Sequence, residues 1–61
     1  MMTRKDYVAT AEILNSYAIA GQDNILISSL INKISEDFAD LFASDNPNFD
    51  ETRFFNAVTK S

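Results

Sequence analysis

Carboxylates are the only side chains in this sequence that could serve as general acids or bases at neutral pH. The chain contains no histidine and no cysteine, which excludes imidazole and thiol chemistry and the zinc sites built from those ligands. The best-spaced carboxylates are Glu36 and Asp40, four residues apart and therefore on one face of a helix. Two such ligands fall short of the six or more oxygens that calcium takes. We interpret the pair as part of a solvated helix face.

The remaining polar residues offer no catalytic arrangement. No serine has a histidine to activate it, and a single glycine, Gly21, cannot build a glycine-rich phosphate loop. The acidic stretch 45–50 lacks the glycine of a calcium loop, and Asn56 stands where the loop's final glutamate belongs. We predict that the protein is not an enzyme and uses no metal and no cofactor.

Length and charge narrow the function classes further. The 61 residues suffice for a single small helical domain, 1–61, and five basic against nine acidic residues leave a net charge of −4. Phosphate backbones repel such a chain, so no direct nucleic-acid binding is expected. The alternative is a dimeric nucleic-acid-associated accessory protein in which Arg4, Lys5 and Arg53 converge. A core this small is marginal without disulfides or metal, and association is a common remedy.

No stretch of the sequence has the character of a signal peptide or a membrane span. Asp6 and Glu12 interrupt the apolar sequence that follows Arg4 and Lys5. The longest apolar runs, 17–20 and 25–27, are far below the roughly 20 residues of a membrane-spanning helix. We expect a cytoplasmic protein with no membrane partner.

The first helix is predicted over residues 4–20. Thr3 and Asp6 approximate a capping box, Met2 and Tyr7 have the spacing of a hydrophobic staple, and Gly21 stands where a left-handed residue ends a helix. One broad apolar face is expected to be buried and comprises Tyr7, Val8, Ala11, Leu14, Ala18 and Ile19. A second stripe comprises Ala9, Ile13, Tyr17 and Ala20. Because a contiguous exposed stripe with a tyrosine is typical of an interface, we predict a homodimer formed through it.

The second helix is predicted over residues 24–43, capped by Asp23 or Asn24. Its apolar residues fall within an arc of about 120° and comprise Leu30, Leu41, Ile34, Ile27, Phe38, Ile31 and Phe42, while Ser35 belongs to the polar remainder. Its second half carries Glu36, Asp37 and Asp40. We predict that these acids bind a partner with a basic surface; the alternative is that they only keep the protein in solution.

A short third helix is predicted over residues 51–59, after a turn at 44–48. Asp50 has the position of an N-cap, and Phe49 and Phe54 have the spacing of a hydrophobic staple. Arg53 is expected to pair with Asp50 or Asp45. The helix should bury Phe54, Phe55 and Val58. The predicted fold is therefore all-α, with three helices: a long antiparallel helical hairpin closed by a short third helix.

Two blocks of the sequence, TRKDYV at 3–8 and NPNFDETRF at 46–54, resemble a group of short bacteriophage-encoded proteins. Members often begin with T-R-K-[DH]-[YF] and end with N-P-x-F-D-x-x-R-F, and Asn48 stands where that pattern usually has arginine. The resemblance implies a phage or prophage origin, hence the cytoplasm of an infected bacterium, and it implies no activity. We therefore expect a small acidic protein–protein interaction protein, a phage accessory factor that binds a host or phage protein.

Overall fold

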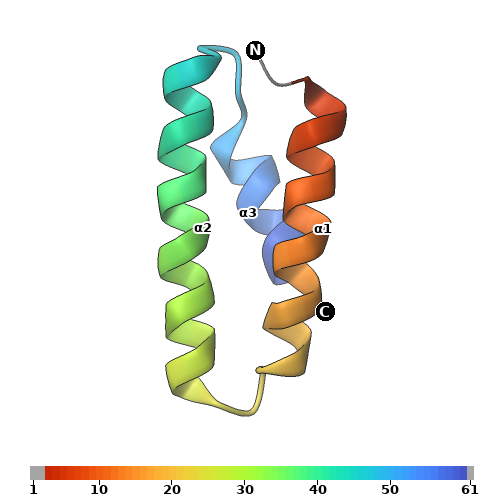
Figure 1. The fold of residues 1–61 in the computed structure, drawn as a ribbon, viewed down its shortest axis with the longest axis vertical. Helices are drawn as coiled ribbons and strands as arrows, with labels where there is room; N and C mark the ends of the chain where they lie inside the picture. Colours follow the sequence, from red (N-terminus) through yellow and green to blue (C-terminus); the bar gives the residue numbers. More distant parts are fainter. Residues whose placement is uncertain (1–2, 61) are drawn as a thin grey trace.

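The computed structural model describes residues 3–60, which form three helices and no strand. Helix α1 (Arg4–Ala20) and helix α2 (Ile25–Asp45) run antiparallel as a long hairpin. Helix α3 (Glu51–Thr59) turns back along one side of that hairpin, behind it in Figure 1. The predicted all-α, three-helix fold is confirmed. None of these helices is both long enough and apolar enough to cross a lipid bilayer.

The bounds of α1 and α3 are those predicted, whereas α2 extends two residues beyond the predicted end. Pro47 disfavours the helical conformation only at the residue before it. Asn46 accordingly is extended, with φ −139° and ψ 108°, while Ser44 and Asp45 remain helical. At the other end Asn24, not Asp23, is the cap: its Oδ1 accepts the N–H groups of Leu26 and Ile27, at 3.0 and 3.3 Å.

The two ends of α1 are held by different means. Asp6 accepts the Thr3 N–H at 2.9 Å, as in a capping box, while Met2 of the predicted staple lies outside the described residues. Gly21 ends the helix, but the left-handed conformation predicted for it is wrong, because its φ is −103°. Glycine is needed there for space: a Cβ at Gly21 would lie 3.0 Å from the Ile27 Cβ and would collide with the Ile27 Cγ2.

Helix α3 is fixed at both ends. Asp50 Oδ1 accepts the Arg53 backbone N–H at 3.0 Å, and the Phe49 and Phe54 rings meet with centroids 5.6 Å apart, so the predicted cap and staple both form. At the far end, Asn15 on α1 donates hydrogen bonds to the carbonyls of Val58 and Lys60, at 2.8 and 2.5 Å. The end of α3 therefore depends on α1 for hydrogen bonds that its last turn cannot supply.

Aromatic rings fill the core at the end of the hairpin where α3 begins. Tyr7 lies 4.8 Å, between ring centroids, from both Phe42 and Phe49, and Phe42 also meets Phe54 at 5.5 Å in an edge-to-face contact. Such tilted pairs stabilise beyond their buried area. The whole buried apolar core comprises Tyr7, Ala11, Leu14, Ile31, Ala39, Phe42, Phe54 and Val58.

Candidate interaction surfaces

Helix α2 uses only one edge of its apolar arc to build the core. Ile31 and Phe42 are buried, together with Ser35 and Ala39, which lie beyond the arc. Ser35, expected on the polar side, is fully buried, and its hydroxyl donates to the Ile31 carbonyl at 2.7 Å. With a rotation of 100° per residue, the direction in which the buried residues of α2 point differs by about 75° from the middle of its apolar arc. Most of the apolar arc of α2 is therefore not buried in the core.

The short third helix explains this rotation. At about 1.5 Å per residue, the nine residues of α3 span roughly 14 Å, against roughly 32 Å for the 21 residues of α2. Because α3 lies on one side of the hairpin, each long helix buries the side that faces both α3 and the other long helix. The opposite side of the hairpin has no helix to cover it (Figure 1).

The second stripe predicted on α1 is exposed along its whole length. Ala9, Ile13, Tyr17 and Ala20 are all exposed, Ile13 and Tyr17 at 60% each. The buried side of α1 is narrower than expected. Tyr7, Ala11 and Leu14 are buried and Ala18 is half-buried, but Val8 and Ile19, both predicted for this side, are exposed.

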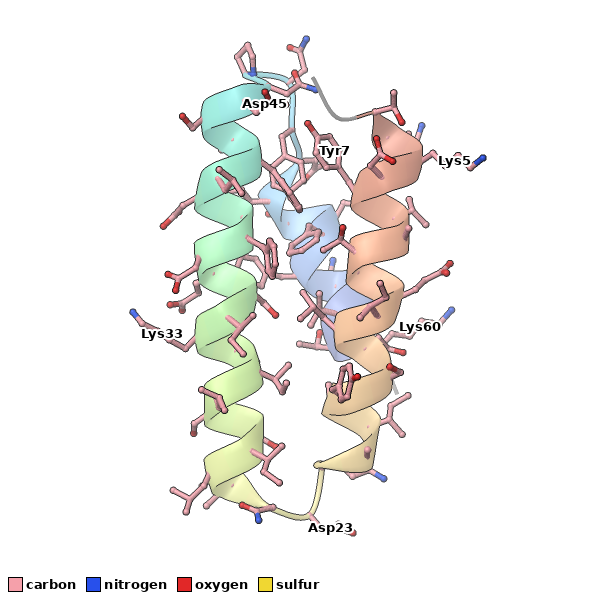
Figure 2. The ribbon with its side chains drawn as sticks, in the orientation of Figure 1. Lys5, Tyr7, Asp23, Lys33, Asp45 and Lys60 are labelled. Atoms are coloured by element: carbon pink, nitrogen blue, oxygen red, sulfur yellow. The ribbon has the colours of Figure 1, made fainter. Side chains whose placement is uncertain are left out.

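Six of the ten exposed large apolar residues within residues 3–60, all on α1 and α2, lie on one side of the hairpin. On each helix these residues are turned by about 100° from the buried side in the same rotational sense, which in an antiparallel pair directs both sets to the same side. That side is the one opposite α3, and Figure 2 looks onto it. We call this surface the hairpin face; it comprises Ile13, Tyr17, Ile27, Leu30, Ile34, Phe38 and Leu41. A shallow hollow of about 210 Å³ on it is lined by Ile34, Asp37, Phe38 and Leu41.

The hairpin face is large for a protein of this size. Leu30 and Leu41 are each 58% exposed, and the seven side chains together present roughly 600 Å² to solvent, the upper end of the largest patch on a typical monomer. The chain as a whole exposes 4492 Å². A compact monomer of 6.8 kDa exposes about 4,000 Å².

The predicted acidic residues Glu36, Asp37 and Asp40 are all exposed on α2. Lys33 lies on the same side of the helix and projects away from α1 in Figure 2. Within the described part of the chain, no ion pair joins Lys33 to any of these acids. This side of α2 is therefore solvated and acidic, with one base that the sequence reasoning did not weigh.

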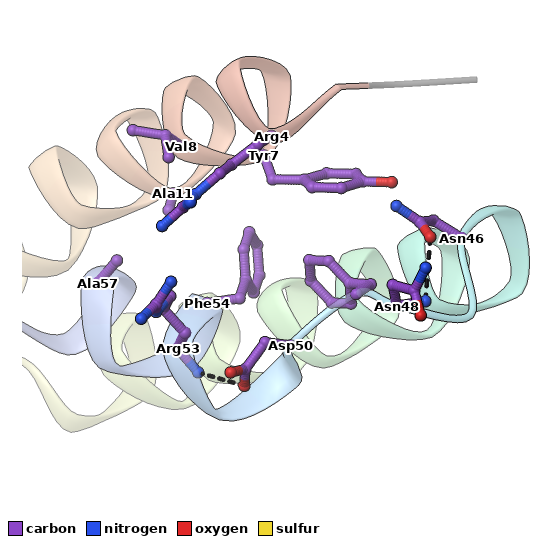
Figure 3. Close-up of a pocket in the computed structure, with 11 residues that line it drawn as sticks. Arg4, Tyr7, Val8, Ala11, Asn46, Asn48, Asp50, Arg53, Phe54 and Ala57 are labelled. Atoms are coloured by element: carbon purple, nitrogen blue, oxygen red, sulfur yellow. Dashed lines mark hydrogen bonds between the residues drawn. The ribbon is translucent and has the colours of Figure 1, made fainter.

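Within one chain, two of the three basic residues of the nucleic-acid alternative lie at the same pocket. Arg4 and Arg53 line one pocket of about 360 Å³, between the start of α1, the 46–50 turn and α3 (Figure 3). Lys5 is not part of its lining and projects away from α1 in Figure 2. The ion pair expected for Arg53 is not formed within residues 3–60, where Asp50 accepts the backbone N–H of Arg53.

One residue of the lining, Tyr7, also carries a buried polar atom that the sequence could not have marked. Tyr7 is 7% exposed, and its hydroxyl is buried without a hydrogen-bond partner in the described structure. Apart from Ala11 and Ala57, every residue of the lining belongs to the two sequence blocks 3–8 and 46–54. The two blocks, distant in the sequence, thus meet in space.

No protein-family model, no curated protein and no solved structure matches this chain. In residues 3–60 no three acidic side chains gather closely enough to hold a metal ion. Any function proposed for the chain therefore rests on the hairpin face, the acidic side of α2 and the pocket between α1 and α3.

Proposed function

We propose that this chain is a small, acidic, non-enzymatic protein–protein interaction protein that forms a homodimer through its hairpin face. The observation that supports the proposal is the exposed apolar arc of α2, with Leu30 and Leu41 each 58% exposed. Contiguous apolar surface of this extent is unfavourable in water and marks interaction sites on soluble proteins.

A second copy is the partner that best fits the area and the chemistry of this face. A stable interface buries about 800 Å² on each partner, and the hairpin face with its flanking residues approaches that area. A two-fold axis would set the face against itself, so that apolar surface meets apolar surface. The small side chains of Ala9 and Ala20 flank Ile13 and Tyr17 and would permit close approach of the helices. The same contact would enlarge a core that is small for an independent domain.

Sedimentation equilibrium tests this dimer with three single substitutions. The wild type should sediment at twice 6.8 kDa at high micromolar concentration. Ile13→Glu and Leu30→Glu should each shift the protein to monomer, because each sets a charge in the middle of the interface. Ile25→Glu is the matched control: Ile25 is 79% exposed but lies on the far side of α2, so the dimer should persist. A wild type that stays monomeric would contradict the proposal.

Glu36 and Asp40 stay free in such a dimer, with Asp37 at the edge of the hairpin face, and this acidic side of α2 is the surface that we propose for a second protein. Glu36, Asp37 and Asp40 are exposed and have no ion pair in the described residues, which favours a partner with a basic surface. The two block resemblances support a phage accessory role, with a host or phage protein as partner in the cytoplasm of an infected bacterium. Charge complementarity of this kind acts mainly on the association rate.

A charge-matched pair of triple variants tests the acidic surface. Glu36→Gln/Asp37→Asn/Asp40→Asn should slow association with a purified basic partner by about tenfold at low salt and flatten its salt dependence. The control, Glu12→Gln/Asp23→Asn/Glu51→Gln, removes the same charge from exposed positions outside this surface. Equal association rates for the two triple variants in stopped-flow mixing would show that Glu36, Asp37 and Asp40 only keep the protein in solution.

A further inference from the structure

We propose that the pocket between α1 and α3 binds an organic phosphate monoester with an aromatic body, its phosphate held between Arg4 and Arg53. Such a site is separate from the hairpin face and from the acidic side of α2. The lining combines two guanidinium groups, an aromatic floor and a pair of side-chain amides.

The cationic end of the pocket is formed from two different helices. Figure 3 shows the Arg4 side chain reaching from α1 toward that of Arg53 on α3. Neither guanidinium has an ion pair in the described residues, and the only acid of the lining, Asp50, accepts the backbone N–H of Arg53 as a helix cap. Two like charges brought together without a counterion favour an anion between them, and the planar guanidinium donors suit the oxygens of a phosphate.

At the other end of the pocket, a buried hydroxyl group lacks a hydrogen-bond partner. The Tyr7 hydroxyl is buried without a partner and points toward the Asn46 and Asn48 side chains in Figure 3. Asn46 Oδ1 accepts the Asn48 backbone N–H at 3.0 Å, which leaves the Asn46 amide group as an available donor. Because buried polar groups are nearly always hydrogen-bonded, this end is incomplete as it stands. A ligand that hydrogen-bonds the side chains of Asn46 and Asn48 would allow one of these amides to reorient and to hydrogen-bond the Tyr7 hydroxyl.

The size of the pocket requires more than a phosphate. About 360 Å³ lies within the range of small-ligand sites, roughly 300–1,000 Å³, and exceeds the volume of a free phosphate ion. The rings of Phe49 and Phe54, with centroids 5.6 Å apart, belong to its lining. An aromatic ring that lies on this floor, with its phosphate at the arginines and its polar edge at the asparagines, matches all three parts of the lining.

Titration of the ¹⁵N-labelled protein with uridine 5′-monophosphate, uridine and inorganic phosphate tests the proposal by NMR. Uridine 5′-monophosphate should shift the amide signals of Arg4, Tyr7, Asn48 and Arg53 to saturation. Uridine and inorganic phosphate should each bind about tenfold more weakly or worse, since each lacks one part of the ligand. Saturable binding of the monophosphate with this order of affinities supports the site.

Substitutions separate the pocket from general charge effects. Arg4→Gln and Arg53→Gln should each weaken binding by about tenfold or more, while Lys5→Gln, which removes the same charge next to Arg4 but outside the pocket, should change it less than about twofold. Ala57→Glu, an exposed position of the lining, should abolish binding by placing a carboxylate beside the guanidinium groups. Non-saturating shifts, equal affinity for uridine, or equal effects of Lys5→Gln and Arg4→Gln would overturn the proposal.

Discussion

Tyr7 illustrates how one residue can serve the core and a pocket at once. Its ring contacts Phe42 and Phe49 with centroids at 4.8 Å, which places it in the centre of the aromatic cluster. Its hydroxyl, in contrast, is buried with no partner in the described structure. The ring therefore stabilises the fold, and the hydroxyl opposes it.

Replacement of Tyr7 by phenylalanine should separate these two contributions. Removal of a buried hydroxyl that makes no hydrogen bond should leave the free energy of unfolding unchanged or raise it by up to about 1 kcal/mol. Tyr7→Ala, which also removes the ring, should lower it by about 3–5 kcal/mol. Urea unfolding followed by circular dichroism measures both. A loss of more than about 1 kcal/mol in Tyr7→Phe would show that the hydroxyl is hydrogen-bonded in solution.

Among the elements, α3 is the shortest, and identifiable side-chain contacts hold each of its ends. It has nine residues, and Asn15 is the side chain of α1 whose hydrogen bonds hold its far end. Its near end is held by the Asp50 cap and by Phe54 in the aromatic cluster. Since the placement of α3 decides which side of the hairpin is covered, these contacts also define the hairpin face.

Substitution of Asn15 should loosen α3 while leaving α1 helical. Asn15→Ala removes two hydrogen bonds to carbonyls at the end of α3 and should lower the free energy of unfolding by about 1–2 kcal/mol. Ser16→Ala is the control, because Ser16 is exposed and its hydroxyl bonds only the Ile13 carbonyl of its own helix, at 2.7 Å. Amide hydrogen exchange should accelerate first in α3. Equal exchange in the two variants would contradict a role for Asn15 in docking α3.

The bounds of the helices could be predicted because local chemistry sets them. Asp50 and Asn24 cap their helices through their own side chains, and Pro47 constrains only its neighbour Asn46, so a few adjacent residues suffice. The reason for Gly21 could not be predicted in this way. It depends on the approach of Ile27 from the next helix, which periodicity does not report.

The sequence also does not predict which side of α2 is buried. Periodicity shows that Leu30 and Phe42 share a face, but not how much of that face a nine-residue helix can cover. The sequence predicts the exposed stripe with Ile13 and Tyr17, whereas periodicity alone does not show that most of the α2 arc remains exposed. Arg4 and Arg53, at opposite ends of the chain, meet only because α3 folds back beside α1.

For the whole molecule, the central feature is a hairpin covered on one side only. Exposure of 4492 Å² by a chain of 6.8 kDa exceeds that of a compact monomer by about 500 Å². A second copy on the hairpin face would bury most of that excess. The acidic side of α2 and the arginine pocket would remain accessible, so self-association and the two other proposed contacts are compatible.

Intermolecular NOEs in a mixed-label sample test this account most directly. Half of the chains carry ¹³C-labelled Ile and Leu methyl groups, the other half are unlabelled, and a filtered experiment records only contacts between chains. We predict NOEs from the methyl groups of Leu30, Ile34 and Leu41 to protons of the second chain, with none from Ile25, which is exposed on the opposite side of α2. Absence of NOEs from the hairpin-face methyl groups at millimolar concentration, or NOEs confined to Ile25, would contradict the account.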